Sequence, residues 1–495
     1  MIQSATGTQP VIVAVGGVYF ALVVAISIWA GRRTRTARDF FVAGGGIGLT
    51  VLALSSMSAT ISGFAFIGGP ALVYTMGLGG VFIVLPAAIT SSLVAWVLAR
   101  RMRLLAEVRG VMTIPDAIGA RYNSPAAQGL TALAILVAVI GYTATNILAL
   151  GVVVHSIFGV GLAWGIWIGM AITLLYSASG GILAGVYNDV MQGTLMAVAS
   201  VLVFLFVLRT GNEVGGFAHV LLQDDASFLS PWGTGSPLAA LSLFFVFGMG
   251  ALGQPHVIHK FYMLRDPRRL RWYPALMTGT LVLTLLLYVG VGVAVKALVA
   301  NGDLAPLTAP DDATPTFLLG YTPILLAALV FSGVAAAIMS TVNSFLSVGA
   351  AAISHDIPIA FGRRVGDELR VGRLATVVIS VSAAILAQLS GSMVAFLGIF
   401  GWGLFASTIV PALAIGLNWR GATRAGAIAS IATGLVVTLL FETLGYTGAY
   451  SFPAGVTISG LSLVLSMLVF FGVSWMTRSS AAANLPVDVA AVMEG

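Results

Sequence analysis

Long apolar segments separated by short polar loops recur along the whole chain. An apolar stretch of 18 or more residues can cross about 30 Å of hydrocarbon as a helix. Hydropathy predicts about thirteen such helices in the 495-residue chain, which indicates an all-α integral membrane protein. The spans are expected at 10–30, 46–74, 79–99, 127–155, 160–179, 188–209, 236–259, 273–298, 318–353, 373–390, 393–417, 424–446 and 455–476.

Composition supports this interpretation and narrows it. Hydrophobic residues make up 59% of the chain and charged residues 8%, whereas soluble domains carry about 25% charged residues. The formal charge of +6 comes from basic residues in short loops between apolar runs, so it predicts membrane topology and no nucleic-acid partner. Cysteine is absent, which excludes a disulfide framework and a thiolate metal site.

The basic residues also predict orientation. Arginines follow the first apolar run and none precedes it, so this run is expected to be a retained helix with its N-terminus outside. With thirteen spans, all basic residues except Arg209 and Lys296 then fall on the cytoplasmic side. We therefore expect a multi-pass protein of a bacterial-type inner (plasma) membrane, with a cytoplasmic C-terminus.

The sequence contains few motifs that could supply energy for transport. No glycine-rich loop is followed by Lys-Ser/Thr, so an ATPase site is unsupported, and no loop is long enough for a separate domain. No nucleophile–base pair or metal cluster stands out, so we expect no enzyme activity, no cofactor and no obligate protein partner. The remaining classes are a channel or an ion-driven carrier.

The spans are almost free of ionisable side chains, and Asp189 and Asp356 lie near the ends of theirs. A sodium ion can be held without them, by hydroxyl groups and by carbonyls of unwound helices. Two segments are rich in such oxygens: Ser55–Gly63 and 335–344. In the second, Ser340 and Thr341 share a helical face with other small residues, a pattern that suits close helix packing as well as ion binding.

Six motifs occur in order across most of the chain. They are Asp39-Phe40-Phe41 with Gly44-Gly45-Gly46, Leu54-Ser55 through Gly63 to Gly69-Pro70, Thr113-Ile114-Pro115-Asp116 with Arg121-Tyr122, Ser179-Gly180-Gly181 through Asn188-Asp189 to Gln192, Gly253-Gln254-Pro255-His256, and Met339-Ser340-Thr341. With these motifs the chain resembles the sodium:solute symporter family, which includes carriers of proline, pantothenate, monocarboxylates and sugars.

The resemblance implies a leucine-transporter-like core built from two inverted repeats of five helices. It predicts a first peripheral helix and cytoplasmic loop at 1–45, repeat 1 at 46–209, an outer loop at 210–235, repeat 2 at 236–417, and two C-terminal helices with a tail at 418–495. Helix breaks are expected around Ser58–Gly63 and Gly248–Gly253, because inverted repeats place broken helices and ligand sites near the bilayer midplane.

The resemblance also implies binding residues. The sodium ligands are the backbone carbonyls of Ser58, Ile61 and Ala337 and the hydroxyls of Ser340 and Thr341. Asp189 is assigned either to the ion pathway or to capping a helix, and His256 is interpreted as structural or interfacial. The substrate pocket would be lined by Thr60, Gly63, Phe64, Tyr142, Asn146, Phe247 and Ala251.

These residues predict a secondary active symporter that couples inward Na⁺ flow to the uptake of a small organic solute by alternating access. The expected partners are Na⁺, the solute and the lipid bilayer. An amino acid such as proline fits the small aromatic pocket, and a monocarboxylate or a vitamin is the alternative. A passive channel or facilitator, or a transporter-like sensor, are the competing classes.

Overall fold

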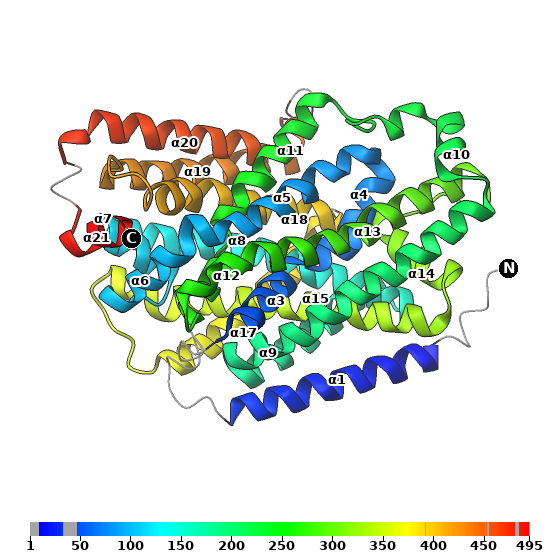
Figure 1. Ribbon diagram of the computed structural model, residues 1–495, viewed down its shortest axis with the longest axis horizontal. Coiled ribbons are helices and arrows are strands. Elements are labelled where there is room, and N and C mark those ends of the chain that lie inside the picture. The colour runs from blue at the N-terminus through cyan, green and yellow to red at the C-terminus, as the bar shows by residue number, and fades with distance from the viewer. Residues whose placement is uncertain are drawn as a thin grey trace.

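The computed structural model describes residues 9–32, 47–391, 393–450, 452, 455–480 and 485–494, and the ribbon is helical almost throughout (Figure 1). Within these residues the β-structure is a single bridge between Ile47 and Leu264. The expected all-helical membrane fold is confirmed. The motif residues Asp39–Phe41 and Gly44–Gly46 lie outside the described residues.

The α-helices appear in Figure 1 in chain order from blue to red. They are α1 (Gln9–Gly31), α3 (Leu49–Thr60), α4 (Gly69–Met76), α5 (Val81–Val94), α6 (Arg100–Arg109), α7 (Ile114–Tyr122), α8 (Pro125–Phe158), α9 (Leu162–Glu213), α10 (Phe217–Asp224), α11 (Pro237–Gly250), α12 (Pro255–Ile258), α13 (Tyr273–Ala300), α14 (Ala313–Tyr321), α15 (Ile324–Ala351), α16 (Ile357–Ala360), α17 (Glu368–Ser390), α18 (Val394–Ile409), α19 (Arg424–Tyr446), α20 (Ile458–Met476) and α21 (Val487–Glu494).

Eleven segments of the described chain are long and apolar enough to cross a membrane, and Leu49–Thr60 and Leu162–Leu175 are shorter apolar helices. Segment Phe64–Arg109 contains the turn Gly77–Gly80, so its first part continues the span that α3 begins. Helix α9 has 52 residues where two spans were expected, and at ~1.5 Å per residue it is long enough for both. Eleven candidate spans are therefore found in the described residues, and the number thirteen stays a prediction, because a second crossing within α9 needs a turn and α9 runs unbroken from Leu162 to Glu213.

The most buried spans are built on α8, α15 and α18, with α15 packed against α8 and α9 and with α18 packed against α8. Helix α1 lies on one side of the bundle and the pair α19–α20 on the opposite side (Figure 1). Helices α6, α7 and α21 lie at one end of the bundle, and α10 and α14 lie at the other.

The outward faces of the spans carry large apolar side chains. Trp164, Leu175 and Leu468 are 70%, 69% and 63% exposed. Inside the bundle, small residues allow helices to approach closely, as membrane helix packing requires. A Cβ on Gly69, for example, would lie 2.0 Å from the ring of Tyr288. The large apolar side chains on the outward faces, in contrast, suit contact with lipid.

Candidate functional site

The first candidate element is the interruption between α3 and α4. Helix α3 ends at Thr60, Ile61 takes an extended conformation, and a π-helical turn (Phe64–Gly68) then leads into α4. Gly63 permits this geometry, because a Cβ there would lie 2.6 Å from the Cβ of Ala149 and 2.8 Å from Ile338 Cγ1. The expected break around Ser58–Gly63 is confirmed.

A second interruption separates α11 from α12. A 3₁₀ turn (Ala251–Gly253) follows α11, Gln254 is extended, and Pro255 starts α12. Proline suits the first turn of a helix because the N–H it lacks would have no partner there. The side-chain amide of Gln254 donates to the carbonyl O of Gly250 (2.9 Å), so it replaces part of the lost helical bonding. This break also lies where it was expected, to within a few residues.

Three of the five predicted sodium-binding residues, Ser58, Ser340 and Thr341, make contacts between α3 and α15. The hydroxyl of Ser58 donates to that of Ser340 (3.3 Å), and the hydroxyl of Thr341 donates to the carbonyl O of Ala59 (3.0 Å). Ser58, Ile61, Ala337, Ser340 and Thr341 are all at most 2% exposed. Hydroxyls of one helix thus face the interrupted backbone of another, which is the arrangement that a neutral-oxygen cation site needs. Their role as Na⁺ ligands stays a prediction.

A buried ion pair adjoins these hydroxyls. Asp189 on α9 accepts hydrogen bonds from Lys260 Nζ (2.8 Å), from the hydroxyl of Ser55 (2.6 Å) and, through its other oxygen, from the hydroxyl of Ser340. Lys260 Nζ also donates to the carbonyl O of Ser55 (2.6 Å). Both charged side chains are 2% exposed. One carboxylate therefore connects the predicted sodium ligand Ser340 to a buried ammonium group.

This ion pair corrects two expectations. The interior was expected to be almost free of ionisable groups, and Lys260 was counted with the residues of a cytoplasmic loop. Lys260 instead lies in the 3₁₀ segment His259–Met263 that follows α12, and this segment packs against α3. The helix-capping interpretation of Asp189 is wrong, because Asp189 lies inside α9, far from either end.

Aromatic rings from the π-helical turn at the first break and from helices α8, α11 and α18 form the second half of the candidate site. Phe64 stacks on Phe247 with ring centres 5.8 Å apart, and Phe247 stacks on Trp402 of α18 at 5.2 Å. Tyr142 of α8 lies 6.4 Å from the Trp402 ring. Ala251, at the second break, is buried with them. The predicted pocket residues from different spans therefore do lie near one another at the two breaks.

Polar groups at the first break are already partnered. Asn146 accepts from the backbone N–H of Gly63 (3.0 Å), and the hydroxyl of Ser62 accepts from the N–H of Phe64 (3.2 Å). The hydroxyl of Thr60 donates to the carbonyl O of Ser56 in its own helix (2.8 Å). A substrate carboxylate at this half-helix N-terminus would have to replace Asn146 and Ser62 as acceptors.

The sequence analysis missed Trp402. Its ring is 3% exposed, and its Nε1–H makes no hydrogen bond to the residues that the structure describes. A tryptophan between Gly401 and Gly403 inside an apolar span was the available signal. His256, in contrast, is buried against the ring of Phe345 (4.5 Å), which fits a structural rather than an interfacial residue.

The segment 310–321, which includes α14, contacts both the π-helical turn before α4 and the start of α18. The hydroxyl of Thr314 donates to the carbonyl O of Phe66 (2.6 Å), and the Asp311 carboxylate accepts from the N–H of Val394, the first residue of α18 (2.9 Å). Burial raises the pKa of Asp311 to about 6, although the Val394 hydrogen bond opposes this shift. One short loop therefore ties the first interrupted helix to α18.

The geometry can be compared with known proteins. The family model described as "Sodium:solute symporter family" matches residues 40–434. The chain belongs to the sodium:solute symporter family. The osmoregulated proline transporter OpuE of Bacillus subtilis (strain 168) is 29% identical and aligns over 94% of this chain and 95% of its own. The sodium/pantothenate symporter of Escherichia coli (strain K12) is 27% identical, over 91% and 94% of the two chains.

Solved structures agree on the fold. A Na⁺-coupled sialic acid symporter in a substrate-bound, outward-open state superposes with a TM-score of 0.73 at 19% identity, over 96% of this chain and 98% of that one. A nucleobase-cation-symport-1 family transporter in a closed conformation gives 0.51 at 15% identity, over 91% and 100%. The expected architecture of a Na⁺-coupled transporter is therefore confirmed as a fold.

Proposed function

We propose that this protein is a secondary active symporter that uses inward Na⁺ flow to take up a small organic solute, with proline as the preferred candidate. The observation that carries the proposal is the contact of the Ser340 hydroxyl with the Ser58 hydroxyl, and of the Thr341 hydroxyl with the carbonyl O of Ala59, at the end of α3 just before the break. Hydroxyls and unwound carbonyls suit a weakly held, releasable cation such as Na⁺.

Asp189 supports Na⁺ as the coupling ion. Its carboxylate touches Ser340, so it adds negative charge beside the proposed ion, while Lys260 neutralises it. We propose that the ammonium group limits Na⁺ affinity and so favours release. A site of this kind can load Na⁺ from a high external concentration and still empty into the cell.

The aromatic group supports a small, ring-shaped or amine-bearing solute. The rings of Phe64, Phe247, Trp402 and Tyr142 offer flat apolar faces, which also attract ammonium groups. Relatives over nearly the whole chain are proline transporters, and the pantothenate symporter among them keeps a vitamin as the second candidate. A short monocarboxylate is a third.

The proposed topology places the N-terminus outside and the C-terminus in the cytoplasm of a bacterial-type plasma membrane. The end of the bundle with α6, α7 and α21 would then be cytoplasmic, and the end with α10 and α14 external. The excess of Lys and Arg in the loops at the first end supports this orientation.

A ligand panel separates the candidate solutes. Thermal unfolding of the purified protein would be followed with proline, short monocarboxylates and pantothenate, each in NaCl and in KCl. A coupled solute stabilises the protein more in Na⁺ than in K⁺, because binding of one ligand strengthens binding of the other. Equal shifts in both salts for every solute would contradict coupling.

The same assay tests Trp402. Phenylalanine at this position keeps the stacking on Phe247 but removes the buried N–H. Because the smaller ring also leaves space in a buried position, the stability without solute is measured first. Relative to that baseline, we expect Trp402→Phe to weaken binding of the coupled solute by about 1 kcal/mol, roughly fivefold. Unchanged affinity would remove Trp402 from the proposed pocket.

Paired substitutions test the sodium site. Ser340→Ala with Thr341→Ala removes both hydroxyls, so the Na⁺ concentration needed for half-maximal stabilisation by solute should rise at least tenfold. Ser332→Ala is the matched control, because its hydroxyl lies on the same helix and bonds back to Ala328 (2.8 Å). The assignment fails if the double variant and the control show the same Na⁺ dependence.

A further inference from the structure

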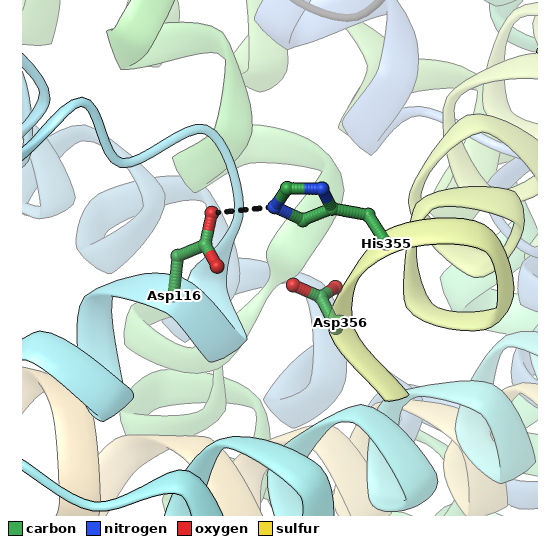
Figure 2. A group of neighbouring side chains, drawn as sticks. All are labelled: Asp116, His355 and Asp356. Atoms are coloured by element: carbon green, nitrogen blue, oxygen red, sulfur yellow. Dashed lines mark hydrogen bonds and ion pairs between the residues drawn. The ribbon is translucent and has the colours of Figure 1, made fainter. Parts of the chain in front are cut away.

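A cluster of metal-ligating side chains lies apart from the sodium site. Asp116 on α7, and His355 and Asp356 at the end of the span that begins with α15, each offer one ligand atom, and these atoms all lie within 4.8 Å of one another. Figure 2 shows the imidazole pointing at the Asp116 carboxylate, with the Asp356 carboxylate beside them. Three groups from two distant parts of the sequence therefore converge.

The spacing suits a small divalent cation. His355 Nε2 and Asp116 Oδ2 are 3.2 Å apart. Two ligands at ~2.0–2.1 Å from one metal ion, at the angles of tetrahedral or octahedral coordination, are themselves about 2.8–3.4 Å apart. His355 and Asp116 thus stand at the spacing that a shared ion would impose, and Asp356 lies within 4.8 Å of both ligand atoms.

The far side of the histidine provides an independent observation. Nδ1 of His355 faces a carboxylate oxygen of Glu368, at the start of α17, at 3.5 Å. Histidines that bind metals almost always donate their other ring N–H to a carboxylate, a carbonyl or water, which turns the free nitrogen toward the metal. Glu368 stands in this orienting position, and the opposite nitrogen points into the cluster.

The two aspartates are also held in place from behind. Gln128 donates to Asp116 (2.8 Å), as does the backbone N–H of Met112 (3.2 Å), and the hydroxyl of Thr113 donates to Asp356. Asp356 is 1% exposed, while the side chains of His355 and Asp116 remain 12% and 14% exposed. The cluster is therefore preorganised and can still be reached from outside.

The balance of charge points to a cation. Asp116, Asp356 and Glu368 bring three carboxylates to one imidazole: Asp116 and Glu368 pair with His355, and Asp356 accepts a hydrogen bond from the Thr113 hydroxyl. Two carboxylates this close repel each other in a water-poor site unless a proton or a cation lies between them. A bound divalent ion would compensate the excess negative charge.

We propose that Asp116, His355 and Asp356 form a binding site for a divalent transition-metal ion of the Zn²⁺ type, with Glu368 orienting the histidine. One nitrogen and two oxygen ligands suit Zn²⁺ better than Mg²⁺ or Ca²⁺, which prefer oxygen ligands alone. Water completes the coordination. The ion would clamp α7, the end of the α15 span and the start of α17, whatever solute the protein carries.

Calorimetric titration with Zn²⁺ tests this site. Purified, tag-free protein washed with chelator should bind one equivalent tightly. His355→Gln removes the nitrogen ligand and should weaken that equivalent at least tenfold. The matched control is His219→Gln, because His219 lies on the opposite end of the bundle and contacts Gln223 (3.1 Å). It should leave the tight equivalent intact.

A second variant guards against loss of folding. Glu368→Gln keeps all three ligands and should weaken Zn²⁺ binding by about 10- to 100-fold without removing it. Co²⁺ in place of Zn²⁺ should give visible absorption that His355→Gln abolishes. If Zn²⁺ binds equally to the original protein and to a folded His355→Gln variant, or binds to neither, then His355 is an ordinary ion-pair partner and the proposal is wrong.

Discussion

Lys260→Gln is the substitution with the largest expected effect on the candidate site. The charges of Lys260 and Asp189 lie 2.8 Å apart and 2% exposed. At an effective dielectric constant of ~20, this distance corresponds to an attraction of about 6 kcal/mol. Removing one partner of such a buried pair leaves an unpaired charge and costs about 3–5 kcal/mol. The variant should therefore be strongly destabilised.

The assay is a double-mutant cycle on thermal unfolding in detergent. Lys260→Gln, Asp189→Asn and the double variant are compared, and the double variant should lose much less stability than the two single losses added together. Lys296→Gln is the control. Lys296 pairs with Asp224 at 3.2 Å, but both side chains are partly exposed, so this change should cost about 1 kcal/mol or less.

Sodium makes the prediction more specific. Without Lys260, the Asp189 carboxylate keeps its full charge beside Ser340, so Na⁺ should stabilise Lys260→Gln more than it stabilises the original protein. Additive losses within ~0.5 kcal/mol would show that the pair does not form in solution. An unchanged effect of Na⁺ would separate Lys260 from the ion site even if the cycle shows coupling.

Two further predictions concern the first break and the α14 loop. Gly63→Ala should cost about 1–3 kcal/mol in a melting experiment, because the new Cβ overlaps Ala149; Gly17→Ala, with nothing within 4 Å, is the control and should be near neutral. The raised pKa of Asp311, about 6, means that the folded protein binds the proton more tightly than the unfolded chain, so stability falls as pH rises through this value. Asp311→Asn should abolish a loss of about 1.4 kcal/mol between pH 5 and pH 7, whereas Asp303→Asn, at an exposed position, should retain it.

The spans and the two breaks could be predicted because their causes are local. Long apolar runs define the spans, and Gly63 and Pro255 mark places where a regular helix cannot continue. The hydroxyl face of α15 follows from helical spacing. The family resemblance identified the hydroxyl face of α15 as an ion-binding face. The spacing could not do so, because the same spacing suits helix packing equally well.

The ion pair could not be predicted, because its partners lie 71 positions apart in the chain. Lys260 lies in a short basic stretch that resembles a loop, and it is buried because α12 and the segment His259–Met263 pack against α3. Trp402 and the cluster around His355 could not be predicted for the same reason, because their positions depend on which helices pack together. Sequence patterns identify such residues only after the contacts between distant spans are known.

Uptake into proteoliposomes distinguishes Na⁺-coupled symport from passive transport. Purified protein would be reconstituted, and internal proline, a monocarboxylate or pantothenate would be measured after imposing an inward Na⁺ gradient or an equal K⁺ gradient. We expect that one of these solutes accumulates above its external concentration with Na⁺ only, and that Ser340→Ala with Thr341→Ala removes this accumulation. Uptake that never exceeds equilibrium, or that is equal in both gradients, would contradict Na⁺-coupled symport.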